Sequence, residues 1–261
     1  MTGNTSLRKL KKFMPANTII KTAIILAAGK GTRLRSVTGD EFPKPLTPID
    51  NQPVIEYSID ALINSGVKRI LIGCGHLLES FQYLTEKYDE VEIVENPKYD
   101  ILASIYTLLI LEPYVEEPFY LLEADILYDP KIFQRLSLDQ NSQNKIVTST
   151  PLSLDDNVYY RSENGNLVQL TKKQMGEKPE GVMTGIWALS AGILQRFSEY
   201  CSRLQIDYSE DYEVMLAQFS SEVEPIEIVH IPDLNWCEID NEDHLKYAQT
   251  QVLPQIKNHS Q

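Results

Sequence analysis

Residues 22–46 read TAIILAAGKGTRLRSVTGDEFPKPL and divide into three physically different parts. The run 23–27 is apolar and contains β-branched residues, which is typical of a strand buried on both faces of a parallel sheet. Residues 28–33 supply small side chains, two glycines and two cations, so backbone N–H groups can approach a polyanion closely while the charges neutralise it. Lys44 then stands between two prolines, which hold its ammonium on a stiff segment. The stretch therefore predicts a strand that ends in a phosphate-binding loop.

Two familiar phosphate-binding patterns do not fit this loop. The dinucleotide pattern requires a third glycine three places after Gly31, where Leu34 stands, and the P-loop pattern requires Gly-Lys-Ser/Thr, whereas Gly31 follows Lys30. A bare Gly-x-Gly would also suit an ordinary strand-to-helix turn. The addition of Thr32, Arg33 and the Pro-Lys-Pro favours phosphate binding.

The composition limits the classes of ligand. The chain has 261 residues, which is ample for one large α/β domain, and 24 Lys and Arg stand against 37 Asp and Glu, a formal net charge of −13. Such an acidic surface argues against nucleic-acid binding and against stable association with an anionic membrane. The charge of a bound nucleotide must therefore be met locally, by Lys30, Arg33 and Lys44 and by a divalent cation.

The cysteine pattern indicates a reducing compartment. Cys74, Cys201 and Cys237 form no Cys-x-x-Cys pair, and three cysteines cannot all be bridged within one chain. No apolar run approaches membrane-spanning length, and the first residues lack the apolar core of a secretory signal. We therefore expect a cytoplasmic protein with reduced thiols.

Apolar strand patterns alternate with helical patterns after the opening stretch. The expected strands are 69–73, 91–94 and 118–122, and the expected helices are 53–66, 78–88 and 103–111. This order predicts an α/β fold with a Rossmann-like, mixed but mainly parallel sheet flanked by helices. Ligands of such sheets bind beyond the carboxyl ends of the strands.

The second half of the chain changes character. Short strands are expected at 145–150, 158–162, 167–170, 181–190 and 226–231, and helices near 191–204, at 212–220 and from 242. Asn164-Gly165-Asn166 is typical of a hairpin turn and predicts a small β-hairpin subregion. We expect a single domain over 21–253, made of the halves 21–130 and 145–253, between a basic extension at 1–20 and a tail at 254–261.

Two acids end apolar strands. Asp125 follows the strand 118–122, and Asp240 follows the apolar residues near 236–239. Two carboxylates brought to one crevice beside a phosphate loop make an oxygen-rich Mg²⁺ site. Asp243 suits compensation of a helix dipole, and Asp240 or Asn241 could instead cap that helix. Glu123 lies two residues before Asp125 on the same side of an extended strand, which suggests a supporting role.

Further candidates face the same crevice from the second half. Lys172, after the hairpin, could reach a reacting phosphate. Tyr159, Asp211, Tyr212 and Glu213 combine aromatic faces with carboxylates, which is how proteins hold an ammonium group, although such tyrosines also serve as plain packing. No spacing of Ser or Cys with His and an acid supports covalent catalysis, and no cluster of ligands supports zinc.

Residues 27–33 and 43–46 together resemble the N-terminal motif of the nucleoside-triphosphate transferase superfamily, whose A-type fold is shared by sugar-phosphate nucleotidylyltransferases and cytidylyltransferases. Residues 72–76, 95–99, 104–106, 121–125 and 238–244 resemble one small bacterial branch, which acts with CTP on phosphocholine or 2-aminoethylphosphonate. The resemblance runs from about residue 22 to 253. It implies the nucleotide-diphospho-sugar transferase type of fold, with an NTP-binding first half and an acceptor-binding second half.

The resemblance also implies roles for residues. The implied catalytic lysine is Lys44, and the implied Mg²⁺ ligands are Asp125 and Asp240. From their charge and position we add Arg33 and Lys172 as further catalytic candidates. The implied nucleotide-binding residues are Leu26, Ala27, Ala28, Gly29, Lys30, Gly31, Thr32, Arg33, Gly75, His76 and Ser104. The implied acceptor-binding residues are Tyr159, Asp211, Tyr212, Glu213 and Gly185. A lone histidine is more often structural than a ligand contact, which is the alternative interpretation of His76. Relatives carry small polar residues before the Ser104 position, whereas this chain has Ile101, Leu102 and Ala103.

We therefore expect a Mg²⁺-dependent cytidylyltransferase that transfers CMP from CTP to a small aminoalkyl phosphonate or phosphate and releases pyrophosphate. The favoured acceptor is 2-aminoethylphosphonate, and phosphocholine is the alternative. A sugar-1-phosphate nucleotidylyltransferase and a non-catalytic nucleotide-binding regulator are the further alternatives. The expected assembly is a monomer or a homodimer.

Overall fold

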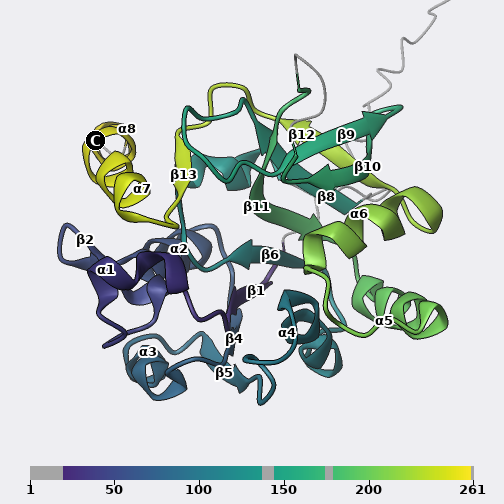
Figure 1. Cartoon of the computed structure of the whole chain (residues 1–261), viewed down its shortest axis with the longest axis horizontal. Helices are drawn as coiled ribbons and strands as arrows, with labels where there is room; N and C mark the ends of the chain where they lie inside the picture. The colour runs from purple at the N-terminus through teal and green to yellow at the C-terminus, as the bar shows by residue number, and fades with distance from the viewer. Residues whose placement is uncertain (1–19, 137–143, 174–178, 260–261) are drawn as a thin grey trace, which may run out of the picture.

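A sheet of nine strands forms the centre of the computed structural model, which describes residues 20–136, 144–173 and 179–259 (Figure 1). The strand order across this described part is β5, β4, β1, β6, β11, β8, β12, β10, β9. The strands span β1 Thr22–Ala27, β4 Arg69–Cys74, β5 Val91–Glu95, β6 Phe119–Glu123, β8 Asn144–Ser149, β9 Tyr159–Glu163, β10 Asn166–Thr171, β11 Val182–Leu189 and β12 Ile226–His230. A mixed α/β sheet flanked by helices confirms the fold class expected from the sequence.

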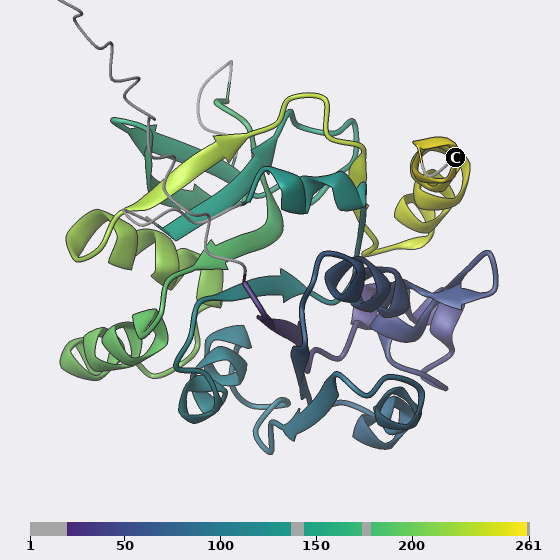
Figure 2. The same ribbon diagram turned by 180° about the vertical axis from the view of Figure 1, so that it is seen from behind.

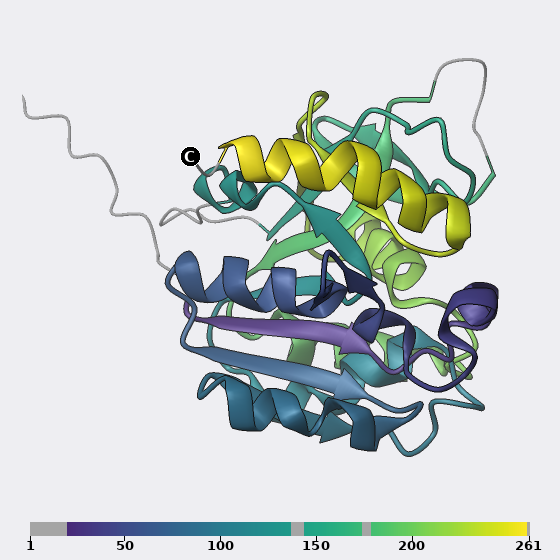
Figure 3. The same cartoon turned by 90° about the vertical axis from the view of Figure 1, so that its left-hand side faces the viewer.

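The first half of the chain supplies the parallel part of the sheet. β1 runs parallel to β4 and to β6, with Ile25 opposite Ile72 on one side and Leu122 on the other, and β5 runs parallel to β4. Figure 3 shows β1 and β4 running in the same direction. The carboxyl ends of β1 and β6 therefore reach the same edge of the sheet, where the loop 28–33 and Glu123 begin.

Helices cover both faces of the sheet. On one face Ile25 packs with Ile55 and Ile59 of α2 (Val54–Asn64), and on the other face Ile24 packs with Ile105 of α4 (Ser104–Ile110). The second face also receives α5 (Ile193–Leu204) and α6 (Tyr212–Glu222). Adjacent residues of a strand point to opposite faces, which explains why the whole run 23–25 is buried.

The second half of the chain joins the sheet through an antiparallel pair, β6 with β11. β9 and β10 form the expected hairpin, in which Glu163 pairs with Asn166 and the two turn residues Asn164 and Gly165 have positive φ. A two-residue turn with positive φ at both positions matches the twist of the flanking strands. The hairpin expectation is confirmed.

A small second sheet brings the two acid-bearing segments together. β7 (Ile126–Tyr128) pairs antiparallel with β13 (Trp236–Glu238), and the N–H of Ile239 donates to the carbonyl of Asp125 at 2.9 Å. The sequence predicts the later strand but not β7. A further short pair joins β2 (Pro48–Ile49) and β3 (Gln52–Pro53).

The C-terminal helices lie on the opposite side of the molecule from α5 and α6 (Figures 1 and 2). α7 (Glu242–Tyr247) continues through a π-helical turn (Ala248–Val252) into α8 (Leu253–His259). Leu253 and Ile256 are buried against Leu34 and Ile49. The segment that the sequence assigns to a tail from residue 254 therefore begins inside a packed helix.

The remaining elements are short. They are α1 (Arg35–Thr38), α3 (Tyr83–Lys87) and 3₁₀ turns at Thr32–Leu34, Lys44–Leu46, Leu78–Phe81, Glu112–Tyr114 and Pro130–Gln134. The expected helix 78–88 is thus a 3₁₀ turn followed by one α-helical turn. Residues 1–19, most of the basic extension, lie outside the described residues. Within the described residues, no helix is both long and apolar enough to span a membrane.

Candidate active site

A cleft of about 400 Å³ opens at the carboxyl ends of β1 and β6, between the two halves of the chain. The structure brings most of the predicted site residues to its walls: Leu26, Ala27, Ala28, Gly29, Gly31, Thr32, Arg33, Lys44, Ser104, Asp125, Asp211, Tyr212, Glu213 and Asp240. Lys172 lines a small adjoining pocket together with Arg33 and Glu213. Residues far apart in the sequence therefore share one site.

The glycine-containing loop leaves space on one side and allows close contact on the other. A Cβ added to Gly29 would meet nothing within 4 Å, so the loop backbone is open to the cleft there. Gly31 has a φ of +58°, and a Cβ on it would lie 2.6 Å from the Cβ of Lys44. Glycine is needed at this position because it accepts the positive φ and lets the Lys44 segment pack against the loop. The Pro-Lys-Pro segment and the loop thus form one unit.

The ammonium of Lys44 lies between two carboxylates. Nζ is 2.5 Å from Oδ1 of Asp240 and also forms an ion pair with Asp125, while Glu238 lies 3.9 Å away. The side chain is 10% exposed. Burial by itself lowers the pKa of Lys44, but the charges of these three carboxylates outweigh it and raise the pKa above its usual value. Lys44 therefore stays charged throughout the physiological pH range.

Asp240 also receives a second cation. Nη2 of Arg33 lies 2.7 Å from Oδ1 of Asp240, whose side chain is 2% exposed, and Nη1 of Arg33 pairs with Asp156. Burial raises the pKa of Asp240, but the positive charges of Lys44 and Arg33 prevail and hold it below its usual value. The Asp240 carboxylate is therefore ionised and paired with both Lys44 and Arg33.

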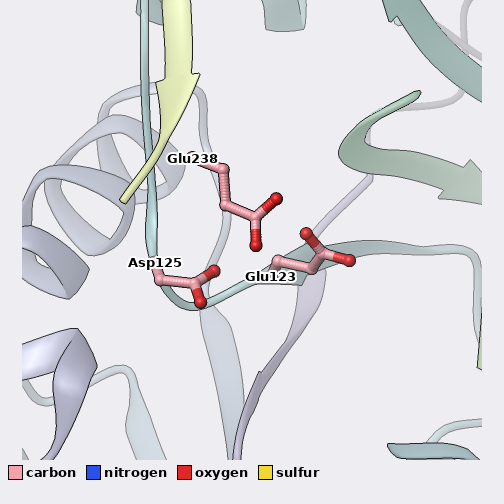
Figure 4. Close-up of side chains that lie close together, drawn as sticks. All are labelled: Glu123, Asp125 and Glu238. Carbon is pink, nitrogen blue, oxygen red and sulfur yellow. The ribbon is translucent and has the colours of Figure 1, made fainter. Parts of the chain in front are cut away.

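Asp125 forms a cluster with two glutamates beside Lys44. Glu123, Asp125 and Glu238 each offer an oxygen, and these oxygens all lie within 4.8 Å of one another (Figure 4). Burial, followed by the charges of neighbouring carboxylates, raises the pKa of Glu123 to about 8 and that of Glu238 well above its usual value. Asp125 thus pairs with Lys44 and also lies close to both glutamates. Four carboxyl groups stand beside the two cations Lys44 and Arg33, and this crowding adds to burial in raising the pKa of the two glutamates.

The end of β6 is tied to α6 by hydrogen bonds. The hydroxyl of Tyr212 donates to Oε1 of Glu123 at 2.9 Å, and the ring stands edge-on to Trp187. At the start of the helix, the N–H of Tyr212 donates to Oγ of Ser104 at 3.0 Å, and that hydroxyl donates to Asp211 at 3.1 Å. Ser104 thereby caps α6 from the start of α4. Its hydroxyl and one oxygen of Asp211 are already engaged with each other.

Gly185 lies beside the carboxylate of Glu123. It has a φ of +75°, where the pairing register of β11 on β8 shifts between Met183 and Trp187. A Cβ on Gly185 would lie 2.6 Å from Oε2 of Glu123. The bulged glycine therefore makes room for the Glu123 carboxylate.

Other predicted site residues lie away from the cleft walls formed by the described residues. The side chain of Tyr159 packs against the apolar core that contains Ile25 and Ile55, and Lys30 is exposed. Gly75 packs under Tyr99, and the N–H of His76 donates to the carbonyl of Ala28 at 3.2 Å. His76 therefore supports the loop backbone.

Sequence reasoning did not assign Glu238 to the site and gave Glu123 only a supporting role. The signal for both was a repeated pattern, because Glu123 and Asp125 are two residues apart, and so are Glu238 and Asp240. Residues with this spacing point to the same side of an extended strand. Each strand end therefore delivers a pair of carboxylates.

The sheet order and the strand-end cleft define a nucleotide-diphospho-sugar transferase-like fold. A solved structure described as the inositol-1-phosphate CTP transferase from T. maritima matches with a TM-score of 0.78 and 23% identity, covering 92% of this chain and 98% of that one. Residues 23–169 match the MobA-like NTP transferase domain family, and the chain belongs to that family. The family membership and the fold expected from the sequence are both confirmed.

Curated relatives include cytidylyltransferases. A 2-aminoethylphosphonate cytidylyltransferase of Lancefieldella rimae is 31% identical over 226 residues, which cover 82% of this chain and 87% of the relative. A choline-phosphate cytidylyltransferase of Streptococcus pneumoniae is 43% identical over 103 residues, 40% of this chain and 44% of the relative. The match to the first relative covers parts of both halves of the chain, which together form the cleft.

Proposed function

We propose that this chain transfers a cytidylyl group from CTP to a small acceptor that carries an amine and a phosphonate or phosphate. The observation that carries the proposal is the position of Lys44, held between Asp125 and Asp240 beside a glycine loop that is open to the cleft. The relatives named above support CTP as the donor. 2-Aminoethylphosphonate is the favoured acceptor, because the relative that matches over most of this chain is named for it.

The nucleotide binds over the loop that follows β1. Backbone N–H groups from Gly29 to Arg33 meet the phosphates, and the guanidinium of Arg33, which is half exposed, neutralises the leaving pyrophosphate. Because Arg33 pairs with Asp156 and Asp240 in the free protein, it exchanges at least one of these partners for phosphate. Lys44 is the cation placed to stabilise charge at the α-phosphate.

The donor set also suits a divalent metal. Carboxylate oxygens are the ligands that Mg²⁺ prefers, and Asp125 and Asp240, with Glu238 beside them, supply such oxygens. Mg²⁺ bound here would neutralise phosphate charge. Lys44 bridges Asp125 and Asp240 in the free protein, so we propose that its ammonium turns toward the phosphates when the carboxylates receive the metal.

The chemistry needs alignment more than proton transfer. An anionic oxygen of the acceptor attacks the α-phosphorus, a new P–O bond forms, and the bond to the bridging oxygen of pyrophosphate breaks with its electron pair. The attacking oxygen is already ionised, so no side chain must remove a proton. The side chains Lys44, Arg33 and Lys172 hold the reacting groups in line and neutralise charge.

Phosphocholine is the alternative acceptor, supported by the choline-phosphate relative. We also propose a reducing, cytoplasmic setting, in keeping with three cysteines that are buried and unpaired, and a monomer or homodimer as the assembly.

A panel of nucleotides against acceptors tests the proposed function. Pyrophosphate release is measured with CTP, UTP, GTP and ATP, each combined with 2-aminoethylphosphonate, phosphocholine and glucose 1-phosphate. We expect turnover with CTP and an amine-bearing acceptor. Turnover confined to glucose 1-phosphate would identify a sugar-phosphate enzyme, and no turnover with any pair would favour a nucleotide-binding regulator.

A further inference from the structure

Glu213 is a buried carboxylate without an ion-pair partner among the described residues. It lies in the first turn of α6, is 7% exposed, and lines both the main cleft and the small adjoining pocket. Within the described part of the chain, its own backbone N–H and the positive charge of Lys172 both lower the pKa of Glu213. The side chains of Glu213 and Lys172 form no ion pair. An ionised carboxylate is costly to bury without a partner. A cationic ligand would supply that partner.

Glu123 faces the same small pocket and is held from two sides. The Tyr212 hydroxyl donates to Oε1 at 2.9 Å, and the bare backbone of Gly185 lies beside Oε2. Glu123 and Glu213 both line the main cleft and the small pocket, so the two carboxyl groups share the same walls. Tyr212 uses Oε1, and among the described residues Oε2 accepts no hydrogen bond.

We propose that Glu123 and Glu213 together bind the ammonium group of the acceptor, and that they select a primary ammonium over a trimethylammonium. The proposal rests on the proposed function, because it assigns the amine end of the acceptor in the same cleft. Tyr212 and Gly185 act as positioning residues, since both act by fixing the carboxylate of Glu123.

The chemistry of the pocket walls separates the two kinds of amine. A primary ammonium carries three N–H donors and forms charge-assisted hydrogen bonds with carboxylates, whereas a trimethylammonium donates none and is bound best by aromatic faces. The described walls of the small pocket contain charged residues with Val158 and Met183, and no aromatic ring. Tyr212 lines the main cleft, but its hydroxyl is engaged and its ring packs edge-on to Trp187.

The neighbouring acid is less suited to this role. One oxygen of Asp211 already accepts a hydrogen bond from Ser104, which holds the start of α6. Glu123 and Glu213 line both the main cleft and the small pocket, whereas Asp211 lines only the main cleft. The two glutamates are therefore the carboxylates placed for an incoming ammonium in the small pocket.

Equilibrium binding tests the assignment separately from turnover. 2-Aminoethylphosphonate and its N-trimethyl derivative are titrated calorimetrically into the full chain with Mg²⁺ and the unreactive α,β-methylene analogue of CTP. We expect the primary amine to bind about 10–100-fold more tightly, because hydrogen bonds to charged groups are lost with the methylated ligand. Glu213→Gln and Glu123→Gln should each remove most of that preference.

Two further variants sharpen the experiment. Glu210→Gln is the matched control, because Glu210 is exposed, lies just before α6 and lines neither pocket, so this variant should keep the preference. Tyr212→Phe keeps the buried ring but removes the hydroxyl, so it should reduce the preference partly and raise the acceptor KM while leaving the KM for CTP unchanged. An unaltered acceptor KM in Tyr212→Phe would contradict its positioning role.

Direct metal binding separates this account from its main rival, in which Glu123 joins Asp125 and Glu238 as a metal ligand. If Glu123→Gln weakens Mn²⁺ binding, measured by electron paramagnetic resonance, but leaves the amine preference intact, the proposal is overturned. Equal binding of both amines by the unmodified chain also overturns it. Selective binding of the primary amine without pyrophosphate release would instead uphold the ammonium site and refute the transfer reaction.

Discussion

Nζ of Lys44 lies 2.5 Å from Oδ1 of Asp240, although 196 positions separate the two residues in the sequence. The contact joins the proline-flanked lysine to the segment that follows the last strand, β13, so it links the two halves of the chain at the cleft. It also places a cation where two carboxylates meet. Lys44, Asp125 and Asp240 thus form one ion-paired group. In the proposed reaction, Lys44 would pair with phosphate and the two carboxylates would bind the metal.

Replacing Lys44 tests its catalytic role. Lys44→Met should lower kcat about 10²–10³-fold, the usual cost of removing a group that stabilises developing charge. The exposed Lys68→Met serves as a control of the same chemistry and should leave kcat unchanged. Near-normal turnover by Lys44→Met would mean that the ammonium serves only to neutralise Asp125 and Asp240.

The metal assignment predicts a change in affinity that can be read without turnover. Asp125→Asn and Asp240→Asn should each weaken Mn²⁺ binding at least about tenfold, because a neutral amide replaces an anionic oxygen ligand. Asp243→Asn, in the exposed first turn of α7, should bind Mn²⁺ as the unmodified chain does. Unchanged Mn²⁺ affinity in both of the first two variants would exclude these carboxylates as ligands.

A comparison of Gly185 with Gly165 separates the effect of backbone strain from the effect of contact with Glu123. Both have positive φ, at +75° and +80°, but a Cβ on Gly185 meets the Glu123 carboxylate, whereas one on Gly165 meets nothing within 4 Å. Each alanine variant should lose about 1–2 kcal/mol of unfolding free energy from the left-handed backbone. Only Gly185→Ala should also raise the acceptor KM. Equal kinetic effects of the two substitutions would rule out a role through Glu123.

The raised pKa of Glu213 predicts a pH-dependent stability. Burial and the charge of Asp211 raise its pKa from 4.5 to about 7, so between these values the folded chain holds a proton that the unfolded chain has released. This group therefore makes the free protein less stable as pH rises through that range. Urea unfolding between pH 4.5 and 8 should show a smaller loss with rising pH in Glu213→Gln than in the unmodified chain. Parallel profiles would show that Glu213 keeps its ordinary pKa.

The sequence predicts the first half of the molecule better than the second. Uninterrupted apolar runs such as 23–27 and the alternation with helices define the parallel strands, because those strands are buried on both faces. The hairpin at Asn164 and Gly165 was equally readable, since its turn needs residues that accept positive φ. β7 was missed because three residues directly after Asp125 carry too little pattern.

The site residues that the sequence predicts are those with a recognisable local pattern, such as an acid that directly follows an apolar strand. Lys44, Asp125 and Asp240 converge on the cleft, but no local pattern shows that Lys44 bridges the two acids, because that contact depends on the pairing of β7 with β13. The contacts of Tyr212 and Gly185 with Glu123 are not predictable from the sequence for a similar reason. Both residues approach Glu123 from elements whose position beside β6 only the three-dimensional fold reveals.

The most direct test of the central claim is ³¹P nuclear magnetic resonance of a reaction containing the chain, CTP, Mg²⁺ and 2-aminoethylphosphonate. We expect the phosphonate signal to be replaced by a coupled pair of signals from a phosphonate–phosphate anhydride, with pyrophosphate appearing in equal amount. CTP that stays intact, or that yields CMP and pyrophosphate without a coupled phosphonate signal, would contradict cytidylyl transfer to this acceptor.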